Sequence, residues 1–506
     1  MSSRIKNTKR NILVGLINRV TSIILPFLIR TAILWILGVE YMGLNSLFTS
    51  ILNVLNLAEL GFSSSIVFSM YKPIAEDDKD TICALMAYYK NVYRFTGTFI
   101  GIVGVLILPF MNKLINGAWP VDINIYLLYL IYLFNTVISY FLFAYKSSLL
   151  NAFQRIDLVN KVQLITLIGQ YLIQLCLLLL FKDYYLYIII TPISTVACNL
   201  ITSYLTDKHF PQYKCRGKIS KELKDDIQKQ VGGLMLGKLS DTSRNSFDSI
   251  VLSAMFGLTV VAIYNNYFYI YSALYGIVIT ITQAMQASVG NSIASETAEK
   301  NYEDLRKFTF IFGWIAGWCS ICMFCLYQHF MSIWVGDDLL LSNLDMILFC
   351  VYFYAINMNN SRNLYFSGRG LWWAGKKTFI YEAVGNLFLN ILLGITLGTT
   401  GVLLATIITI FLFNFIFRTN ILFDKYFHNS PYQFYRDHII YAVTTLVFVV
   451  ATYYVCSFFA EYKGVGGLTI KAIICVIVPN ILYLVIYCRN NQFQKALELV
   501  KYIIKQ

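Results

Sequence analysis

Apolar stretches long enough to cross a bilayer recur along the whole chain, separated by short polar segments. A membrane-spanning helix needs about 20 consecutive apolar residues, and windows of this length predict about fourteen spans. The second and eighth stretches are the longest, so each is either tilted or broken. The pattern predicts an all-α polytopic membrane protein. The predicted spans lie at 11–38, 45–71, 91–112, 122–145, 162–181, 184–206, 232–257, 261–293, 308–333, 344–367, 378–398, 401–423, 438–460 and 466–488.

The longest polar interruption, residues 207–230, divides the predicted spans into six and eight. Shifting the chain by 219 residues places Gly38 on Gly257 and Arg19 on Lys238. Self-similarity at a fixed offset indicates an internal duplication, and parallel six-span repeats are a transporter plan. We therefore predict two pseudo-symmetric six-helix lobes plus two C-terminal helices. The predicted parts are an N-terminal lobe at 1–206, a cytoplasmic linker at 207–230, a C-terminal lobe at 231–423, and two spans with a cytoplasmic tail at 424–506.

Positive charge is distributed unevenly between the predicted loops. Lys and Arg gather at the N-terminus, in 207–230 and in the C-terminal tail, whereas the loops on the other side carry few. The positive-inside rule therefore predicts that both termini are cytoplasmic. This orientation accounts for the net charge of +13, so no nucleic-acid partner is predicted. Because no small-residue cleavage site follows a short apolar core near the N-terminus, we expect the first helix to be retained.

The eleven cysteines lie mostly within apolar segments. The sequence CSICMFC, with Cys319, Cys322 and Cys325, has a spacing that metal sites also use, but its flanks are apolar and no partner cluster accompanies it. Buried free cysteine behaves as a small hydrophobic residue, and the four histidines are scattered. We interpret these cysteines as core residues and predict neither a metal site nor a disulfide framework.

Four charged side chains lie within the predicted seventh span, in the sequence LMLGKLSDTSRNSFDSI. On a helix that turns 100° per residue, Lys238, Asp241, Arg244 and Asp248 fall within an arc of about 120°. A charge at the bilayer centre costs about 2.5–3.5 kcal/mol, so these groups are expected to face a cavity or one another. The alternative is that they form ion pairs that only hold the lobes together.

Two cations in the predicted first span, Arg19 and Arg30, are eleven residues apart and share one face of the helix. Arginine binds phosphate and pyrophosphate groups with parallel hydrogen bonds. We therefore predict that Arg19, Arg30, Lys238 and Arg244 bind a pyrophosphate in a cavity between the lobes. Three acids are candidates for coupling to an ion gradient or for charge balance, namely Asp241, Asp248 and Glu59.

Residues 264–275 read YNNYFYIYSALY and combine tyrosine with amide side chains. Such side chains can stack on sugar rings and form hydrogen bonds with hydroxyl groups. The alternative is an interfacial aromatic belt together with helix packing, which we favour for any single ring. The candidate sugar-contacting residues are Tyr264, Asn265, Asn266, Tyr267 and Tyr271.

Three stretches resemble bacterial lipid-linked oligosaccharide flippases of the Wzx type, which belong to the multidrug/oligosaccharidyl-lipid/polysaccharide superfamily. They are RNSFDSIVLSAMFGLTVVAIYNNY at 244–267, GVEYMGLNSLFTSILNVLNLAELGFSSSIVFSMYKPIAEDD at 38–78 and LLNAFQRIDLVNKV at 149–162. The resemblance extends over essentially the whole chain, including the number of spans.

This resemblance implies a protein of the bacterial cytoplasmic membrane that moves undecaprenyl-pyrophosphate-linked repeat units for O-antigen or capsule. By the same resemblance, Asp248 matches an acid in the family's seventh span, and Arg19 and Arg30 match cations in its first span. The expected partners are the lipid-linked oligosaccharide, membrane lipids, and the polymerase and glycosyltransferases of the same pathway. We expect alternating access without covalent chemistry, and no cofactor apart from a coupling H⁺ or Na⁺.

Other functions are weighed against this one. A multidrug exporter of the same superfamily would need an acid-dominated lumen for cationic drugs, whereas the predicted lumen is balanced or cation-rich; a peptidoglycan-precursor flippase remains an alternative. A polyprenyl-dependent glycosyltransferase or polymerase would need a large outer loop, but the longest, near 334–345, has about ten residues. No G-x-x-x-x-G-K-[ST] motif occurs, so we expect no ATP hydrolysis by this chain.

Overall fold

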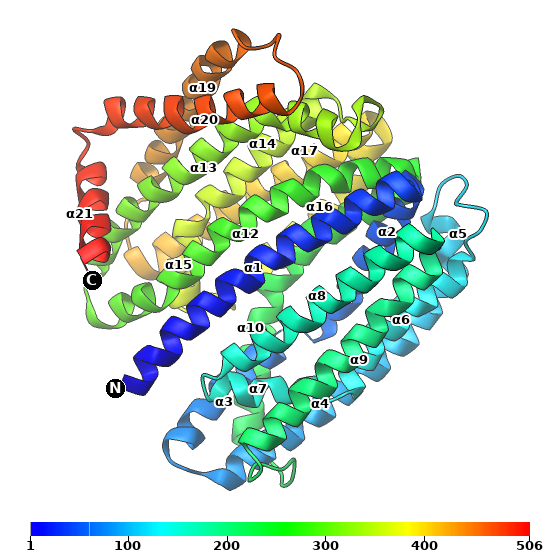
Figure 1. Ribbon diagram of the computed structural model, residues 1–506. Helices are drawn as coiled ribbons and strands as arrows, with labels where there is room; N and C mark the ends of the chain where they lie inside the picture. Colours follow the sequence, from blue (N-terminus) through cyan, green and yellow to red (C-terminus); the bar gives the residue numbers. More distant parts are fainter. Residues whose placement is uncertain (1, 60, 506) are drawn as a thin grey trace. The chain divides into compact units, whose positions relative to one another are not determined.

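A computed structural model describes residues 2–59 and 61–505, and the side chains of 17–57, 59, 61–499 and 501. Over these ranges the chain is helical throughout, without a β-strand. It folds into two compact units, Met1–Ala262 (unit 1) and Ile263–Gln506 (unit 2). Figure 1 labels the helices of both units.

In unit 1, the long helices pack side by side in pairs, α1 with α8, α8 with α9, and α4 with α6 (Figure 1). Close contact between α4 and α6 depends on glycine. A Cβ atom at Gly104 would lie 2.4 Å from the Leu133 side chain, and one at Gly97 would lie 2.7 Å from Tyr140. The helices of unit 1 are α1 (Ser2–Ile36), α2 (Val39–Leu55), α3 (Phe62–Ala75), α4 (Lys79–Ile107), α5 (Met111–Leu114), α6 (Ile125–Phe141), α7 (Ser147–Ala152), α8 (Ile156–Phe181), α9 (Tyr184–His209), α10 (Lys221–Thr242) and α11 (Asp248–Phe256).

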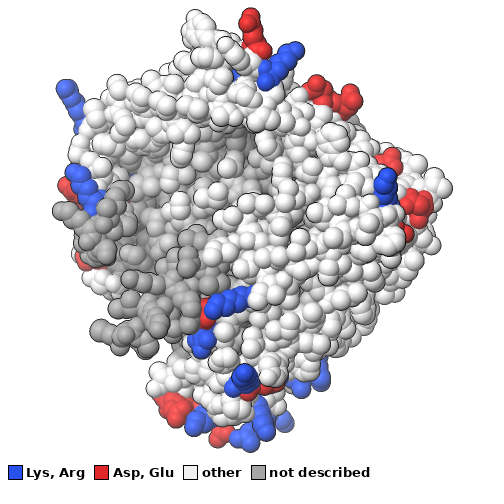
Figure 2. All heavy atoms as spheres, in the orientation of Figure 1, with Lys and Arg blue, Asp and Glu red and all other residues white. Residues whose placement is uncertain are grey.

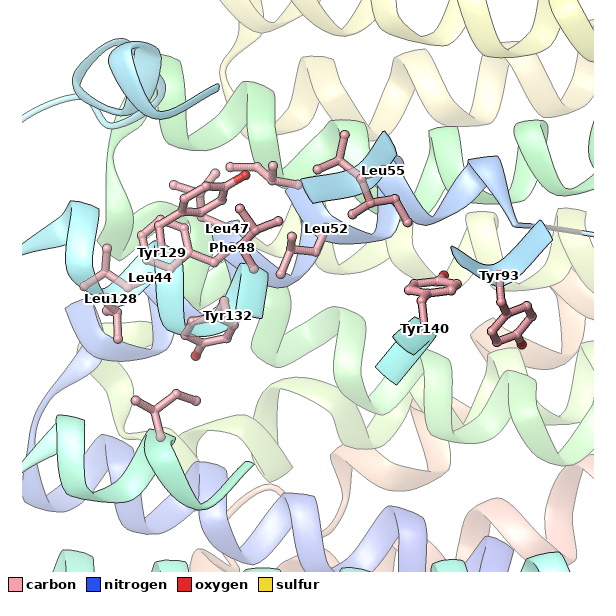
Figure 3. Close-up of a cluster of buried hydrophobic side chains, with 14 of the residues drawn as sticks. Leu44, Leu47, Phe48, Leu52, Leu55, Tyr93, Leu128, Tyr129, Tyr132 and Tyr140 are labelled. Atoms are coloured by element: carbon pink, nitrogen blue, oxygen red, sulfur yellow. The ribbon is translucent and has the colours of Figure 1, made fainter. Parts of the chain in front are cut away.

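The core of unit 1 is formed by apolar side chains of α2 facing tyrosines and leucines of α6 (Figure 3). The Phe48 ring lies edge-on to Tyr129 and Tyr132, with ring centroids 5.5 and 5.6 Å apart. The outer flanks are also apolar, since Trp35, Phe95 and Leu180 are largely exposed. Apolar side chains on the outside are expected where the solvent is lipid.

Charged side chains of unit 1 gather at the ends of its helices. In the lower part of Figure 2, Lys and Arg lie together with Asp and Glu at the ends of the helices, and the surface above them is largely without charge. Exposed ion pairs occur there, Lys72 with Glu76 and Arg216 with Asp80. This separation of charge from apolar flank is the one expected of membrane-spanning helices.

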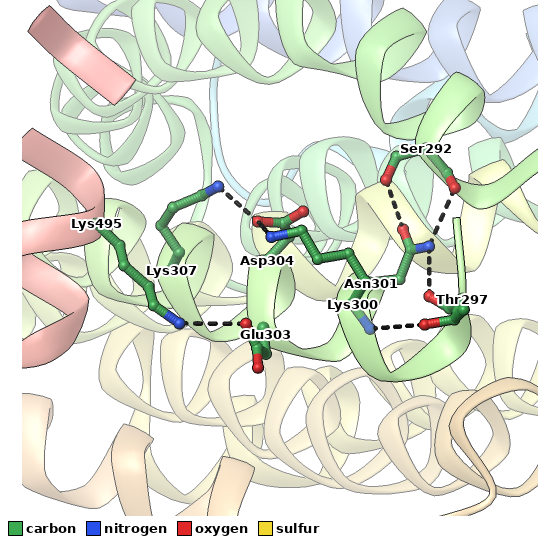
Figure 4. A network of polar contacts seen from close by, with 8 residues as sticks. All are labelled: Ser292, Thr297, Lys300, Asn301, Glu303, Asp304, Lys307 and Lys495. Atoms are coloured by element: carbon green, nitrogen blue, oxygen red, sulfur yellow. Dashed lines mark hydrogen bonds and ion pairs between the residues drawn. The ribbon is translucent and has the colours of Figure 1, made fainter. Parts of the chain in front are cut away.

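In unit 2, α13 is the central helix and packs against α14, α19, α20 and α21. A polar network fixes its first turns (Figure 4). Thr297 caps the helix by accepting from the Lys300 amide, and the Asn301 amide group donates to the Ser292 carbonyl at 3.1 Å. Lys495 joins the C-terminal helix to Glu303 at 3.2 Å. The helices are α12 (Leu258–Ser295, whose first turn lies in unit 1), α13 (Ala298–Val335), α14 (Asn343–Met358), α15 (Asn360–Gly368), α16 (Lys376–Leu397), α17 (Thr399–Thr409), α18 (Arg418–Leu422), α19 (Tyr432–Ser457), α20 (Gly464–Tyr487) and α21 (Asn491–Lys505).

Ten helical segments of the described chain are long and apolar enough to cross a membrane by themselves. The other four predicted spans are each interrupted, and the one at 232–257 also carries four charged side chains. α2 and α3 are separated by a 3₁₀ turn, α6 and Ala144–Ala152 bend by 49°, a π-helical segment separates α10 from α11, and α14 ends at Asn359 before α15. These four broken spans bring the total to the predicted number of about fourteen. The long second stretch is broken, whereas the eighth is the single helix α12.

The two halves repeat the same backbone features at a constant offset. Gly38 and Gly257 both have positive φ, as do Gly117 and Gly336, and the members of each pair are 219 residues apart. α4 and α13 also begin 219 residues apart, at Lys79 and Ala298. Left-handed turns favour glycine because it has no Cβ atom. The predicted duplication and its register are therefore confirmed.

The compact units divide later than the predicted linker at 207–230. α11 stays with unit 1 because the backbone amide of Asn116 donates to the Ser253 carbonyl at 3.0 Å, and its side-chain amide donates to Met255 at 2.5 Å. A Cβ atom at Gly257 would lie 2.5 Å from the Asn116 carbonyl oxygen, so this contact also needs glycine. The lobe and linker limits inferred from the repeat stay a prediction, distinct from this division by packing.

Candidate functional site

Glu59 lies at the break between α2 and α3, directly before a sharp turn in unit 1. The turn uses Gly61 at φ +99°, and a Cβ atom there would lie 3.1 Å from the Val231 carbonyl oxygen of α10. The Tyr93 hydroxyl on α4 donates to Glu59 Oε1 at 2.9 Å, and Tyr89 donates to Tyr93 at 3.0 Å. Two tyrosine hydroxyls thus form a hydrogen-bonded chain that ends at the Glu59 carboxylate, one of the predicted candidates for ion coupling or charge balance.

Further hydrogen bonds between polar side chains of unit 1 join α2, α6 and α9. The Tyr140 hydroxyl donates to Asn56 at 3.2 Å, and that of Tyr132 donates to Asn45 at 2.8 Å. Tyr132 and Tyr184 share a further hydrogen bond of 2.9 Å. Most buried hydroxyl and amide groups in proteins are hydrogen-bonded, because an unpaired polar group is costly away from water. The sequence analysis missed these tyrosines, although the four-residue spacing of Tyr89 and Tyr93 places them on one helix face.

The four charges of the seventh span do not form a single stripe. Lys238 and Asp241 are exposed, whereas Arg244 and Asp248 are buried. The arc of about 120° assumed a regular α-helix, but Ser243–Phe247 is a π-helical segment, which adds a residue to the turn and changes the register beyond it. π-helical turns frequently occur at functional sites.

One direct contact within this predicted set is an ion pair between Arg244 Nη2 and Asp241 Oδ1, at 2.5 Å. This pair matches the structural alternative that the sequence left open. Arg19 is exposed on α1, and Arg30 is half-buried within electrostatic range of Tyr184 on α9. The convergence of Arg19, Arg30, Lys238 and Arg244 on one anion stays a prediction.

The tyrosines of α12 are packing residues in unit 2. Tyr264, Tyr267 and Tyr271 are at most 3% exposed. Tyr267 lies against Tyr327 with centroids 4.9 Å apart, and Tyr271 stacks on Tyr352 at 4.6 Å. These contacts support helix packing, the reading favoured for the single rings. Of the two neighbouring amides, Asn266 is buried and Asn265 is half-buried; sugar contact by this set stays a prediction.

Unit 2 contains a buried ion pair between Glu382 on α16 and Arg418 on α18. The Arg418 guanidinium also lies 3.7 Å from the centre of the Phe379 ring, and its Nε donates to Thr378 at 3.2 Å. From its position near a span end, Arg418 would be expected to extend towards water. That expectation is wrong, because the π-helical segment Ile410–Phe417 before it is followed by a turn that faces the interior.

A second arginine, Arg362 on α15, is completely buried in unit 2. Its Nη2 donates to Asn359 Oδ1 at 2.9 Å and to Asn414, while Nε and Nη1 have no hydrogen-bond partner among the described side chains. Arg362 is within electrostatic range of Arg418 and Glu382, so this trio carries one excess positive charge. Arginine keeps its proton in proteins, so the interior of unit 2 presents a positive potential and free N–H donors. Such a region can attract an anion.

Comparison with known proteins places this arrangement in context. A family described as "Polysaccharide biosynthesis protein" matches residues 8–285. Among curated protein sequences, none matches the chain.

Similar solved structures show the fold. Lipid II flippase MurJ, in an inward closed conformation, is similar with a TM-score of 0.69 and 15% identity, over 94% of this chain and 98% of that one. An inward-facing multidrug resistance MATE family transporter of the MOP superfamily has a TM-score of 0.59 and 14% identity, over 81% and 99% of the two chains. Its outward-facing counterpart has a TM-score of 0.54 and 15% identity, over 81% and 93%.

Proposed function

The chain belongs to the polysaccharide biosynthesis protein family, and from this membership we propose that it flips polyprenyl-pyrophosphate-linked oligosaccharides across the bacterial cytoplasmic membrane. It is a multi-pass membrane protein with the fold shared by a lipid flippase and MATE transporters. The resemblance noted in the sequence is confirmed at this level. The match over residues 8–285 carries the proposal, because it links the chain to the making of polysaccharides.

The chemistry of the cargo explains why a flippase needs this architecture. Transfer of a polyprenyl tail into water would cost about 0.8 kcal/mol per CH₂ group, so the tail stays in lipid while the head group crosses through the protein. Alternating access of the two lobes then changes the side to which the head group is exposed. In this proposal both termini are cytoplasmic, as the positive-inside rule predicts.

Cationic side chains provide the affinity for the pyrophosphate in this proposal. Arg19 and Lys238 are exposed and therefore available to an anion, whereas Arg244 would have to exchange Asp241 for the ligand. The unpaired N–H groups of Arg362 add a donor within unit 2. A charge-assisted hydrogen bond contributes about 1.5–3 kcal/mol, so loss of one cation should slow flipping by about 10- to 100-fold.

Energy for transport would come from an ion gradient acting on one half-buried and one buried acid. Glu59, with its tyrosine donors, and Asp248, at the π-helical segment, are the proposed groups for H⁺ or Na⁺. The sugars would contact the α12 segment through Asn265 once the lobes separate. Polymerase and glycosyltransferases of the same pathway are the proposed protein partners.

A peptidoglycan-precursor flippase is a second candidate function. The fold of lipid II flippase MurJ extends over 94% of this chain, which favours it. The two candidates share a polyprenyl pyrophosphate and differ in the sugar, so the head group is the variable to test.

Reconstitution into liposomes with labelled lipids distinguishes these functions. We expect flipping of a pyrophosphate-linked oligosaccharide, slowed at least about tenfold by Arg19→Ala and by Lys238→Ala at normal insertion levels. Lys72→Ala serves as the control, because Lys72 is exposed at a helix end. Preferential flipping of lipid II would select the second candidate. Equal rates for the wild type, Arg19→Ala and Lys238→Ala would contradict the cationic site.

A further inference from the structure

Three cysteines from three different helices of unit 2 meet at one point. The Sγ atoms of Cys325 on α13, Cys456 on α19 and Cys475 on α20 all lie within 4.8 Å of one another. All three are free thiols. The sequence around Cys325 showed no partner cluster, because Cys456 and Cys475 are more than a hundred residues away and reach it only through tertiary packing.

The cluster lies inside the helix bundle at a definite depth. Cys325 is ten residues before the end of α13 and Cys475 is eleven residues after the beginning of α20, which corresponds to about 15 Å along each helix. Cys456 and Cys475 are 3% and 0% exposed, whereas Cys325 is half-buried. Cys325 therefore gives an ion a route to sulfur atoms that are otherwise protected.

From this geometry we propose that Cys325, Cys456 and Cys475 form a three-coordinate thiolate site for a soft cation of the Cu(I) class. Sulfur ligands at about 2.3 Å from a metal in a plane are about 4 Å apart, so small side-chain rotations are sufficient. Thiolates select soft ions such as Cu(I). Structural zinc requires four ligands, and the group found among the described residues offers three.

A positive charge is placed to offset the thiolates. Lys471 is one helical turn from Cys475 on α20, about 6 Å along the axis. Its Nζ lies 3.2 Å from Nδ1 of His329, which is one turn from Cys325 on α13. Lys471 and His329 therefore lie one helical turn from the cysteine cluster, on the same side of it. Metal binding displaces the thiol protons, and a neighbouring ammonium lowers the cost of the resulting negative charge.

Occupation of the site would connect α19 and α20, the predicted thirteenth and fourteenth spans, to α13. A ligand that binds only the folded state raises its stability. The site goes beyond the proposed flippase activity and is independent of it, since none of its residues belongs to the proposed substrate or coupling groups.

Anaerobic titration of the purified full chain in nanodiscs with Cu(I), against a competing chelator, tests the site. We expect one Cu(I) per protein, loss of this binding in Cys456→Ala and in Cys475→Ala, and about tenfold weaker binding in Lys471→Met. Cys322→Ala and Cys488→Ala are matched controls and should bind like the wild type. Cu(I) should also raise the melting temperature of the wild type and of these controls, but not that of Cys456→Ala.

The opposite results would overturn the proposal. Equal Cu(I) binding by the wild type and Cys456→Ala would place the ion elsewhere. Absence of equimolar binding in the wild type would leave the cysteines as packing residues. A thiol count of the denatured chain that rises by two on reduction in the wild type, and not in Cys456→Ala, would show a disulfide in place of a metal site. Flipping rates are measured on the same samples. Because the cysteines are not part of the proposed transport groups, a change in Cu(I) binding without a change in flipping rate tests the metal site alone.

Discussion

Loss of Glu382 should destabilise unit 2 more than loss of an exposed acid. The side chains of Glu382 and Arg418 are 0% and 5% exposed. Removing one partner of a buried ion pair costs about 3–5 kcal/mol, because the other charge stays buried without compensation. For a unit of this size, about 1 kcal/mol shifts the melting temperature by about 2–4 °C. Glu382→Gln should therefore lower it by roughly 6–20 °C.

The structure places the expected effect towards the upper end of this range. Arg362 is within electrostatic range of both partners, so Glu382→Gln leaves two buried guanidinium groups without an acid between them. Asp424→Asn is the matched control in unit 2, since its ion pair with Lys425 is 3.0 Å long but 60–70% exposed. Exposed pairs contribute at most about 1 kcal/mol.

Tryptophan fluorescence during heating, in nanodiscs, measures these differences. The double variant Glu382→Gln/Arg418→Met should recover much of the loss, because it removes the uncompensated charge and leaves an apolar side chain over Phe379. The reasoning is refuted if Glu382→Gln melts at the same temperature as Asp424→Asn, or if the double variant is no more stable than Glu382→Gln alone.

Three further outcomes concern unit 1. Gly61→Ala should cost about 1–2 kcal/mol in thermal unfolding because of its left-handed φ, whereas Gly169→Ala, with open space at its Cβ position, should be neutral or stabilising. Tyr93→Phe removes the donor to Glu59 and should slow flipping about fivefold in the liposome assay; an unchanged rate would separate this hydrogen bond from transport. Asp248→Asn should alter the dependence of flipping on the ion gradient, and equal rates under all gradients would exclude it as a coupling group.

Several features of this protein are decided by local sequence, and they were predicted. The spans follow from runs of apolar residues, because a helix in lipid satisfies its own backbone hydrogen bonds. The duplication was visible in the register of Gly38 and Gly257, since a left-handed turn favours glycine wherever the fold repeats it. The family resemblance was likewise carried by contiguous stretches of sequence.

The direction in which a span's charged and polar side chains point was decided only by tertiary structure. Arg244 was predicted to lie on a regular helix but lies within a π-helical segment, and Arg418 directly follows another; such segments change the direction in which the residues beyond them point. Whether a tyrosine is a packing residue, as Tyr267 is, or a donor to an acid, as Tyr93 is, depends on the helix opposite.

The sequence by itself determined how many helices cross the membrane and how the two halves correspond, because hydropathy and backbone conformation act over a few neighbouring residues. Tertiary structure alone decided which side chains meet. The partners of Glu59 and Arg418 lie on other helices, 34 and 36 residues away along the chain, and those of Cys325 lie more than a hundred residues away. Close packing at glycine residues and breaks in the helices bring such partners together. Both depend on contacts between helices, so the sequence of one segment does not determine them.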